Sequence, residues 1–159
     1  MDKEHIFFEN YARNWDRDRK ADAKILSSFM ELAGIRPGSV ILDAGCGTGV
    51  LLPYLSAAAG DDGTVEGFDY SQQMIDVAKE KFSYLANVTF TTGDVLKYHF
   101  PKKHYDVVCC LNFYPHIASH SRDVIRRLYE AMVSGGTLLI MHDMPRKAVN
   151  AIHGGQPVL

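Results

Sequence analysis

Short apolar runs alternate with amphipathic stretches along this chain. Five runs have the length and composition of buried strands, and polar or glycine-containing segments bound each of them. They cover residues 39–42, 64–68, 87–91, 105–111 and 137–142. Between them, apolar residues at three- and four-residue spacing predict helices over residues 6–32, from 50 onward, over 72–82 and over 123–133.

Strands that alternate with helices predict an α/β fold with a doubly wound, mostly parallel sheet, because helices then cover both faces and crossovers are right-handed. Ligands in such sheets bind outside the carboxyl ends of the strands. Polar and glycine residues gather at these ends, namely residues 43–49, Asp69, Asp94 and Asn112. The sequence therefore predicts a ligand site at this edge of the sheet.

Composition narrows the class of protein further. Lys and Arg number 17 against 19 for Asp and Glu, so the basic excess of a non-specific nucleic-acid binder is missing. No apolar run approaches the roughly 20 residues of a membrane helix, and the polar first residues are not typical of a signal peptide.

Three cysteines without a CxxC pair favour a reducing, cytoplasmic compartment. Cys109 and Cys110 are adjacent in an apolar run and are expected on opposite faces of a buried strand.

A glycine-rich loop, Gly45-Cys46-Gly47-Thr48-Gly49, stands between a predicted strand and a predicted helix. Glycines let the backbone approach a ligand closely, and the helix N-terminus behind them offers free N–H groups. Asp69 follows 20 residues after Gly49, at the tip of the next strand, where its carboxylate can accept hydrogen bonds from a ribose diol. The combination predicts a nucleotide-like ligand. The loop lacks the P-loop pattern and differs from the dinucleotide fingerprint.

Residues 40–49 resemble the first motif of the class I S-adenosylmethionine-dependent methyltransferases. Further resemblances follow in the family's order, over residues 65–71, 92–95, 106–110 and 132–138. Together they span about residues 36–143. The resemblance implies a Rossmann-like core over 36–143 within a single domain over 1–159, with an N-terminal helical lid over 1–35 and a short tail over 144–159.

The resemblance also implies which residues hold the methionine part of S-adenosylmethionine. Asp43 would reach its ammonium group, directly or through water. Leu111 and Asn112, just past the fourth strand, would border the methionine end. The loop would pass its backbone close to the methionine and the ribose through Gly45, Cys46, Gly47 and Gly49.

The adenosine part falls, by the same resemblance, to residues after the second and third strands. Asp69 would hold the ribose hydroxyls, with Tyr70 beside the adenine. Asp94 would bind the adenine amino group, and Val95 would pack on the ring. Met74 either covers the adenine or belongs to the core, since it stands on an amphipathic helix.

The implied reaction is an in-line displacement of the sulfonium methyl by a small-molecule acceptor, with S-adenosylhomocysteine as product. The cofactor carries an activated methyl, so the protein mainly supplies proximity and orientation. A hydroxyl or ammonium acceptor also needs a base, and His116 is the candidate; alternatively it packs near the pocket without proton transfer. Asn112 is not followed by the Pro-Pro-Tyr signature of amino-group methylation, so no nucleic-acid acceptor is expected.

Residues 7–16 resemble the N-terminal lid of small-molecule methyltransferases. Tyr11 and Trp15 share one helix face and either lie over the sulfonium, gaining cation–π attraction, or simply pack in the core. The mixed charges of residues 13–20 are typical of a solvated helix face. Histidines stand at His116, His120, His142 and His153, and the first two have HxxxH spacing. No Cys or carboxylate joins them in a recognised spacing, so no metal site is predicted.

The chain departs from the family after the fifth strand. About 17 residues remain, too few for the helix and antiparallel hairpin that the family adds there. The fifth strand would then be a sheet edge. It is covered by the tail, where residues 146–153 have a short helical pattern, or paired with a second chain in a homodimer, or completed by a longer protein of which this chain is a fragment.

Three functions follow from these patterns. The leading one is S-adenosylmethionine-dependent methyl transfer to a small molecule. The second is a non-catalytic cofactor-binding or dimerising module, which would bind S-adenosylmethionine without turnover. The third is a nicotinamide-dependent oxidoreductase, which the form of the glycine loop and Asp94 argue against.

Overall fold

A single five-stranded parallel sheet forms the centre of the computed structural model, which describes residues 3–18 and 22–152. Its strand order is β3-β2-β1-β4-β5, and every neighbouring pair is parallel. The order steps outward from β1 in both directions, as a doubly wound sheet requires. The strands are β1 (Val40–Ala44), β2 (Thr64–Asp69), β3 (Val88–Thr92), β4 (Tyr105–Leu111) and β5 (Met132–Met141).

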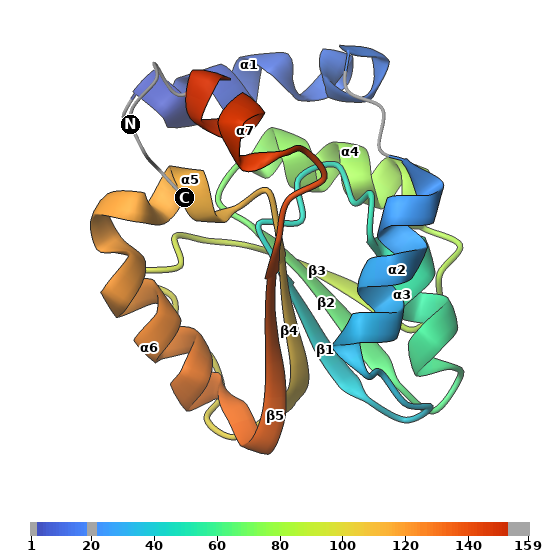
Figure 1. The fold of residues 1–159 in the computed structure, drawn as a ribbon. Helices are drawn as coiled ribbons and strands as arrows, with labels where there is room; N and C mark the ends of the chain where they lie inside the picture. Colours follow the sequence, from blue (N-terminus) through green and yellow to red (C-terminus); the bar gives the residue numbers. More distant parts are fainter. Residues whose placement is uncertain (1–2, 19–21, 153–159) are drawn as a thin grey trace.

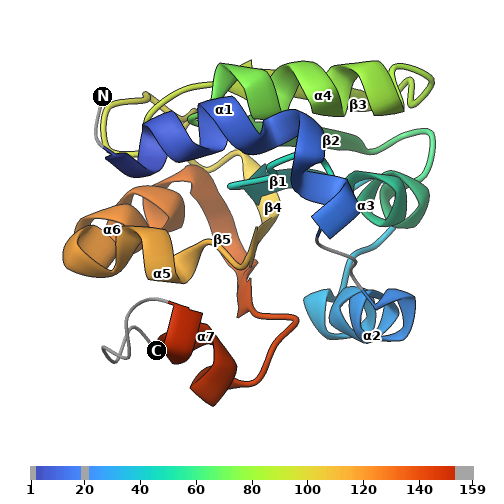
Figure 2. The same ribbon diagram turned by 90° about the horizontal axis from the view of Figure 1, so that it is seen from above.

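Helices cover both faces of this sheet and its upper end (Figure 1). The helices α2 (Ala23–Ala33), α3 (Leu52–Ala59) and α4 (Gln72–Phe82) lie on one face. The other face carries α6 (Ser121–Ala131), which follows the short α5 (Tyr114–Ile117) and the 3-10 turn Ala118–His120. The first helix, α1 (Lys3–Asp18), runs alongside α4 across the carboxyl ends of the strands (Figure 2). This arrangement confirms the predicted α/β class and winding.

The core has two layers because the side chains of each strand alternate between the two faces. In β1, Ile41 packs with α2 and α3, while Leu42 packs on the side of α6. Cys109 and Cys110 divide in the same way, and both are buried, as predicted. Burial on both faces explains why the middle strands are continuous apolar runs.

Two helix boundaries differ from the sequence prediction. The single helix expected over residues 6–32 is two helices, and α2 begins behind Asp22, whose carboxylate accepts hydrogen bonds from the backbone N–H groups of Lys24 and Ile25. Such N-caps satisfy donors that a helix cannot pair internally. The helix expected from residue 50 begins at Leu52, with Pro53 in its first turn.

The junction between α6 and β5 is a larger correction. The helix predicted over residues 123–133 is confirmed as α6, but it ends at Ala131, because Met132 already pairs with Tyr105 of β4. The strand expected over residues 137–142 therefore begins at Met132 and contains Gly135 and Gly136. The two glycines lie inside β5, where the pairing shifts register. Gly135 has a left-handed backbone, φ +81°. Both features are those of an irregular β-bulge.

Past the carboxyl end of β5 the chain turns into α7 (Arg146–Ile152) (Figures 1 and 2). This helix is not packed along β5. Within residues 3–18 and 22–152, the outer edge of β5 has no strand partner, and the sheet has no antiparallel hairpin. Among these residues no helix has the length and apolar character needed to span a membrane.

Candidate cofactor-binding site

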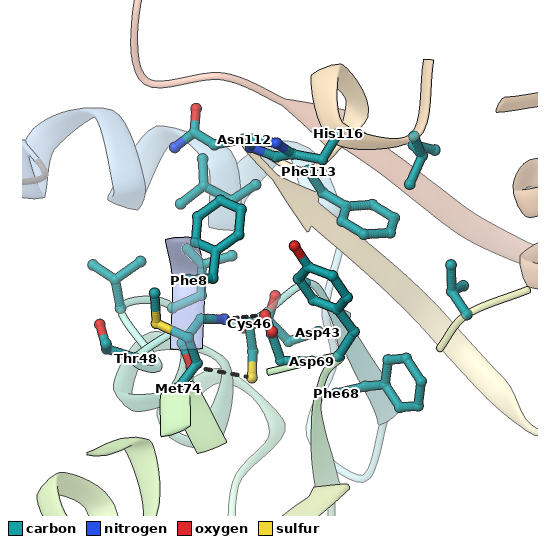
Figure 3. A pocket seen from close by; sticks show the side chains of 18 of the residues that line it. Phe8, Asp43, Cys46, Thr48, Phe68, Asp69, Met74, Asn112, Phe113 and His116 are labelled. Atoms are coloured by element: carbon teal, nitrogen blue, oxygen red, sulfur yellow. Dashed lines mark hydrogen bonds between the residues drawn. The ribbon is translucent and has the colours of Figure 1, made fainter. Parts of the chain in front are cut away.

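A cavity of about 290 Å³ opens at the carboxyl ends of the strands, beneath α1 (Figure 3). The sequence-predicted site residues meet there, although they come from five separate segments. Those that line the cavity are Trp15, Asp43, Gly45, Cys46, Gly47, Asp69, Tyr70, Met74, Asp94, Val95, Leu111, Asn112 and His116. Gly49 and Tyr11 are not among its lining residues.

The glycine loop is anchored to the neighbouring strand at its first turn. The N–H groups of Gly45 and Cys46 both donate to the carbonyl of Phe68, at 2.8 and 3.0 Å. Gly45 has φ +76°, and a Cβ there would lie 2.5 Å from Cδ2 of Phe113. At Gly47, φ is +53° and a Cβ would meet nothing within 4 Å. The loop therefore leaves open space beside Gly47, next to the cavity.

Gly49 serves a different purpose from the other loop glycines. Its backbone is left-handed, φ +86°, and a Cβ would lie 2.8–2.9 Å from side-chain atoms of Leu52 and Phe82. It therefore allows α3 and α4 to pack closely behind the loop. The Cys46 thiol is buried too, and burial, with the nearby Asp69 and Asp43 carboxylates, raises its pKa well above its usual value. It stays protonated.

Asp69 fixes the loop from the end of β2. One carboxylate oxygen accepts the Gly47 N–H at 2.9 Å, and the other accepts the Ser71 N–H at 2.9 Å. Figure 3 shows Asp69 beside Asp43 and Cys46 in the lining of the cavity. Burial raises the pKa of Asp69, and these N–H donors and the charge of His116 oppose that rise. Each oxygen keeps further lone pairs that can accept ribose hydroxyls.

The surroundings of Asp43 disfavour the ionised form of its carboxyl group. Its side chain is 1 % exposed, and its Oδ2 atom has no hydrogen-bond partner among the residues that the structure describes. Burial, and then the neighbouring Asp69 carboxylate, raise its pKa from 3.8 to about 8. Buried polar atoms without partners are rare. A cationic group in the cavity would satisfy this oxygen.

The side of the cavity formed after β3 combines one carboxylate with apolar side chains. The Oδ1 atom of Asp94 accepts the Leu96 N–H at 2.9 Å, and Oδ2 pairs with Lys97 at 3.1 Å. Partial burial acts to raise the pKa of Asp94, but these contacts outweigh it and lower the pKa. Val95 is buried beside it, and Met74, buried on α4, both belongs to the core and lines the cavity.

The lid contributes a residue that sequence reasoning missed. Phe8 lines the cavity and makes edge contacts with Trp15, Tyr70 and His116, at centroid distances of 5.5, 6.0 and 5.1 Å. Phe8 and Trp15 are seven residues apart and share a helix face, which is the signal that could have found it. Tyr11 stacks on Phe7 instead.

Asp16 corrects the expectation that residues 13–20 form only a solvated face. Its Oδ1 atom accepts the Thr48 hydroxyl at 2.6 Å, and its Oδ2 atom accepts Lys81 Nζ at 2.7 Å. Asp16 and Thr48 also line the cavity. The charge run thus contains a contact between the lid and the glycine loop. Residues 19–20 of the run lie outside the described residues.

Residues at and after the ends of β4 and β5 form the remaining wall of the cavity. Asn112 has a left-handed backbone, φ +56°; its N–H donates to Met141 O, and its side-chain oxygen accepts the Asp143 N–H. His116, His120 and Asp143 line this side. No group of three His, Cys, Asp or Glu among the described residues is placed to hold a metal ion, and His153 lies outside those residues.

The charge of the lining fits S-adenosylmethionine. Five aspartates line the cavity and no Lys or Arg does, within the described part of the chain: Asp16, Asp43, Asp69, Asp94 and Asp143. The sulfonium and ammonium groups of this cofactor are cationic, whereas a dinucleotide would bring two phosphates. Carboxylates near phosphates without intervening cations are repulsive. The lining therefore favours the sulfonium cofactor over a nicotinamide dinucleotide.

Fold and site together define an α/β domain that binds a nucleoside-type, positively charged cofactor. A family profile described as a methyltransferase domain matches residues 41–136, and the chain belongs to this family. It is a class I methyltransferase by fold, and its cofactor is S-adenosylmethionine.

Relatives among characterised proteins are quinone methyltransferases by name. The chain is 32% identical over 115 residues to the ubiquinone/menaquinone biosynthesis C-methyltransferase UbiE of Ectopseudomonas mendocina, covering 70% of this chain and 44% of that protein. It is 34% identical over 112 residues to the demethylmenaquinone methyltransferase of Staphylococcus aureus, covering 65% and 45%. The chain thus spans less than half the length of these relatives.

Solved structures agree on the fold. A SAM-dependent methyltransferase from Aquifex aeolicus has a TM-score of 0.69 and 25% identity, covering 83% of this chain and 71% of that one. A TehB-like SAM-dependent methyltransferase from Corynebacterium glutamicum has a TM-score of 0.67 and 26% identity, covering 85% and 72%.

Proposed function

We propose that this chain transfers a methyl group from S-adenosylmethionine to a small, uncharged ring compound. The observation that carries the proposal is the cavity at the strand ends, where the unpartnered Oδ2 of Asp43 and the carboxylate of Asp69 face a cationic cofactor's site. The names of the relatives make a demethylated quinone, in its reduced form, the first acceptor to test. We assign one domain to residues 1–159, with 1–35 as lid and 36–143 as cofactor-binding core.

Binding of the methionine end falls to Asp43 and the glycine loop. Asp43, once ionised, pairs with an ammonium group, which relieves its unpartnered oxygen. The open space beside Gly47 leaves room for the ligand to approach the backbone. Leu111 and Asn112 border the same end of the cavity.

Binding of the adenosine end falls to the residues after β2 and β3. Asp69 accepts ribose hydroxyls with the lone pairs that its backbone donors leave free. Asp94 accepts the adenine amino group. Tyr70, Met74 and Val95 provide apolar surface for the ring.

The chemistry needs few groups from the protein. S-adenosylmethionine supplies a methyl group already activated on a sulfonium. Phe8 and Trp15 close the cavity with aromatic surface and limit the entry of water. His116, in edge contact with Phe8, accepts the hydroxyl proton of a quinol as a ring carbon bonds to the methyl group and the methyl–sulfur bond breaks. S-adenosylhomocysteine leaves, and the proton on the attacked ring carbon moves to the oxygen, which restores the quinol. In the alternative role, His116 only orients the acceptor.

Cofactor binding is tested by titration of the purified chain with S-adenosylmethionine and S-adenosylhomocysteine, with NAD as control. At 100 times the Kd, a ligand adds about 2.7 kcal/mol to the stability of the folded state. For a chain of this size the Tm should rise by roughly 5–10 °C. Asp69→Ala should abolish the rise, whereas Asp123→Ala, on the exposed side of α6, should keep it. A rise with NAD but not with S-adenosylhomocysteine would contradict the proposal.

Acceptor chemistry is tested with radiolabelled S-adenosylmethionine and 1,4-naphthoquinol, a small ring acceptor of the relatives' class. Methylated naphthoquinol is the expected product. His116→Gln should lower kcat by about a hundredfold or more if His116 takes the proton, with the Kd for S-adenosylhomocysteine unchanged. An unchanged kcat would mean that His116 only orients the acceptor. The absence of methyl transfer to any ring acceptor would refute the catalytic proposal.

A second candidate is a cofactor-binding module that does not turn over by itself. It is favoured by the outer edge of β5, which has no strand partner among residues 3–18 and 22–152. Tight binding of S-adenosylhomocysteine without methyl transfer would establish it. For either function we propose a reducing, cytoplasmic location, supported by three free, buried cysteines, Cys46, Cys109 and Cys110.

A further inference from the structure

Asp16 of α1 joins three elements that are far apart in the sequence. It accepts the Thr48 hydroxyl from the glycine loop and Lys81 Nζ from α4. Lys81 also donates to the backbone carbonyl of Thr48, at 3.0 Å. Asp16, Thr48 and Lys81 therefore close a ring of three polar contacts, which we call the lid latch. Thr48 is only 2 % exposed, so its hydroxyl is satisfied within the protein.

The lid latch and Asp69 hold adjacent residues of the loop from opposite sides. Asp69, at the end of β2, accepts the Gly47 N–H, and Asp16, from the lid, accepts the Thr48 hydroxyl. Gly47, Thr48 and Asp16 all line the cavity. The loop conformation that receives the cofactor is therefore the one that docks α1.

Other polar contacts between α1 and α4 do not reach the loop. Glu9 accepts the N–H of Gln72 at 2.7 Å, at the start of α4. Arg13 lies 4.0 Å from Glu80, and both side chains are 75% exposed. The contacts follow the two helices in the same direction, and Figure 2 shows α1 and α4 side by side along their length. Within the described part of the chain, the contacts of Asp16 and Lys81 that form the lid latch link this helix pair to the loop, whereas those of Glu9 and Arg13 do not.

We propose that Asp16 is a positioning residue that couples the docking of α1 to cofactor binding through Thr48. A ligand that holds the loop in its present conformation strengthens the docking of α1, and a docked α1 raises the affinity for the ligand by the same factor, because such coupling is reciprocal. The proposal deepens the proposed function and rests on it for the identity of the ligand.

Trp15 makes the coupling measurable. It is the one tryptophan of the sequence, it lines the cavity, and it precedes Asp16. Docking of α1 should shield its indole from a soluble quencher such as acrylamide. Quenching with and without S-adenosylhomocysteine therefore reports the position of α1 as the ligand binds.

The first experiment measures S-adenosylhomocysteine affinity by calorimetry together with Trp15 quenching. Thr48→Val and Asp16→Ala should each weaken binding about tenfold and reduce the protection of Trp15 by the ligand. Thr48→Ser, which keeps the hydroxyl, should bind like the wild type. Arg13→Gln, on the same helix pair, should also bind like the wild type. The double variant of Thr48→Val and Asp16→Ala should be no weaker than the single variants, because both remove the same contact.

The second experiment separates the latch from general loosening of the lid. Glu9→Gln weakens the docking of α1 at its other end without touching the loop. It should lower the affinity in the wild type through the latch, and should have no further effect in the Thr48→Val background. Additive losses would show that the two contacts act separately and would overturn the coupling.

The proposal also fails if Thr48→Val binds S-adenosylhomocysteine as the wild type does. If the wild type does not bind this ligand, the proposed function fails instead. In that case, hydrogen exchange of the ligand-free protein still tests the lid latch. The amides of α1 should exchange faster in Thr48→Val than in Thr48→Ser, and equal rates would refute the latch by itself.

Discussion

Asp43 occupies a position where the fold opposes its ionisation. It stands in β1, the middle strand, with β2 on one side and β4 on the other, so water does not reach it. The nearest carboxylate, Asp69, adds repulsion. Perturbed groups of this kind concentrate at functional sites because a ligand compensates them.

We expect the stability of the ligand-free protein to fall as pH rises toward 8. The folded-state pKa of Asp43, about 8, lies above the value of 3.8 for a free side chain. The folded state then holds a proton that the unfolded state has lost, so the free energy of unfolding is highest below pH 4 with respect to this group and decreases as pH rises through the folded pKa. Burial shifts the pKa of Asp69 in the same direction. Urea denaturation at several pH values measures the slope, and Asp43→Asn should flatten it. A wild-type slope retained in Asp43→Asn would exclude Asp43 as its source.

Binding of S-adenosylhomocysteine should release up to about one proton near pH 7, because the ligand's ammonium favours the ionised form of Asp43. Calorimetry in two buffers of different ionisation enthalpy measures the number. Asp43→Asn should release none. Equal heats in both buffers for the wild type would mean that Asp43 is already ionised or does not contact the ligand.

Two loop glycines should respond differently to alanine. A left-handed backbone costs a non-glycine residue about 1–2 kcal/mol, and Gly47→Ala should lose about that much stability because its Cβ meets no protein atom. Gly45→Ala should lose about 3 kcal/mol, since overpacking against Phe113 adds a further 1–3 kcal/mol. Urea unfolding compares the two variants. Gly47→Ala should still weaken S-adenosylhomocysteine binding, and equal losses of stability would contradict the close contact at Gly45.

The sequence predicts the strand-end residues well and the lid residues poorly. Asp43 and Asp69 follow apolar runs, and parallel strands bring their ends together, so their meeting was predictable. The contact of Asp16 with Thr48 spans 32 residues and that with Lys81 spans 65. The mixed charges around Asp16 in the sequence do not indicate whether its carboxylate binds a distant side chain or water.

At the scale of elements, the boundary between α6 and β5 shows where local pattern loses to tertiary pairing. Val124, Leu128 and Met132 continue one helical stripe, so the sequence favours a helix through Met132. The strand pairing of Met132 with Tyr105 decides otherwise. The periodicity of apolar residues indicates which face of a helix is buried. It does not show where pairing with another strand ends the helix.

The start of α4 is an element boundary that the sequence did predict. Ser71 is buried, and its hydroxyl accepts the Met74 N–H at 3.2 Å. Ser71→Ala should lower the free energy of unfolding by about 1 kcal/mol, the usual effect of losing an N-cap. Thermal or urea unfolding measures the change, with Ser83→Ala at the exposed end of α4 as control. Equal stability of the two variants would show that Glu9, which accepts the Gln72 N–H, is sufficient to start the helix.

At the scale of the whole molecule, the sequence predicts that β5 is a sheet edge, and among residues 3–18 and 22–152 its outer edge has no strand partner. The short α7 does not run along it. Exposed strand edges pair readily with other chains. A second copy of the chain or further sequence of a longer protein could cover this edge. The oligomeric state decides between the two, whereas the pattern of residues does not.

We expect this chain, when purified by itself, to form a homodimer through β5. Ile140→Lys places a charge at an exposed position of the strand and should shift the protein toward monomer. Tyr129→Lys, more exposed and on α6, is the control. Sedimentation over a wide range of concentration measures the equilibrium. A wild type that stays monomeric throughout would rule out the homodimer.

The latch also bears on how the chain is assembled. The lid is synthesised before its partners, which lie 32 to 65 residues later, in the glycine loop and in α4. Contacts between distant residues form only after the loop between them has closed. The lid therefore docks only after the glycine loop and α4 have been made, and until then Phe8 and Trp15 lack the surface on which they pack. During synthesis this helix depends on a partner that has not yet been made.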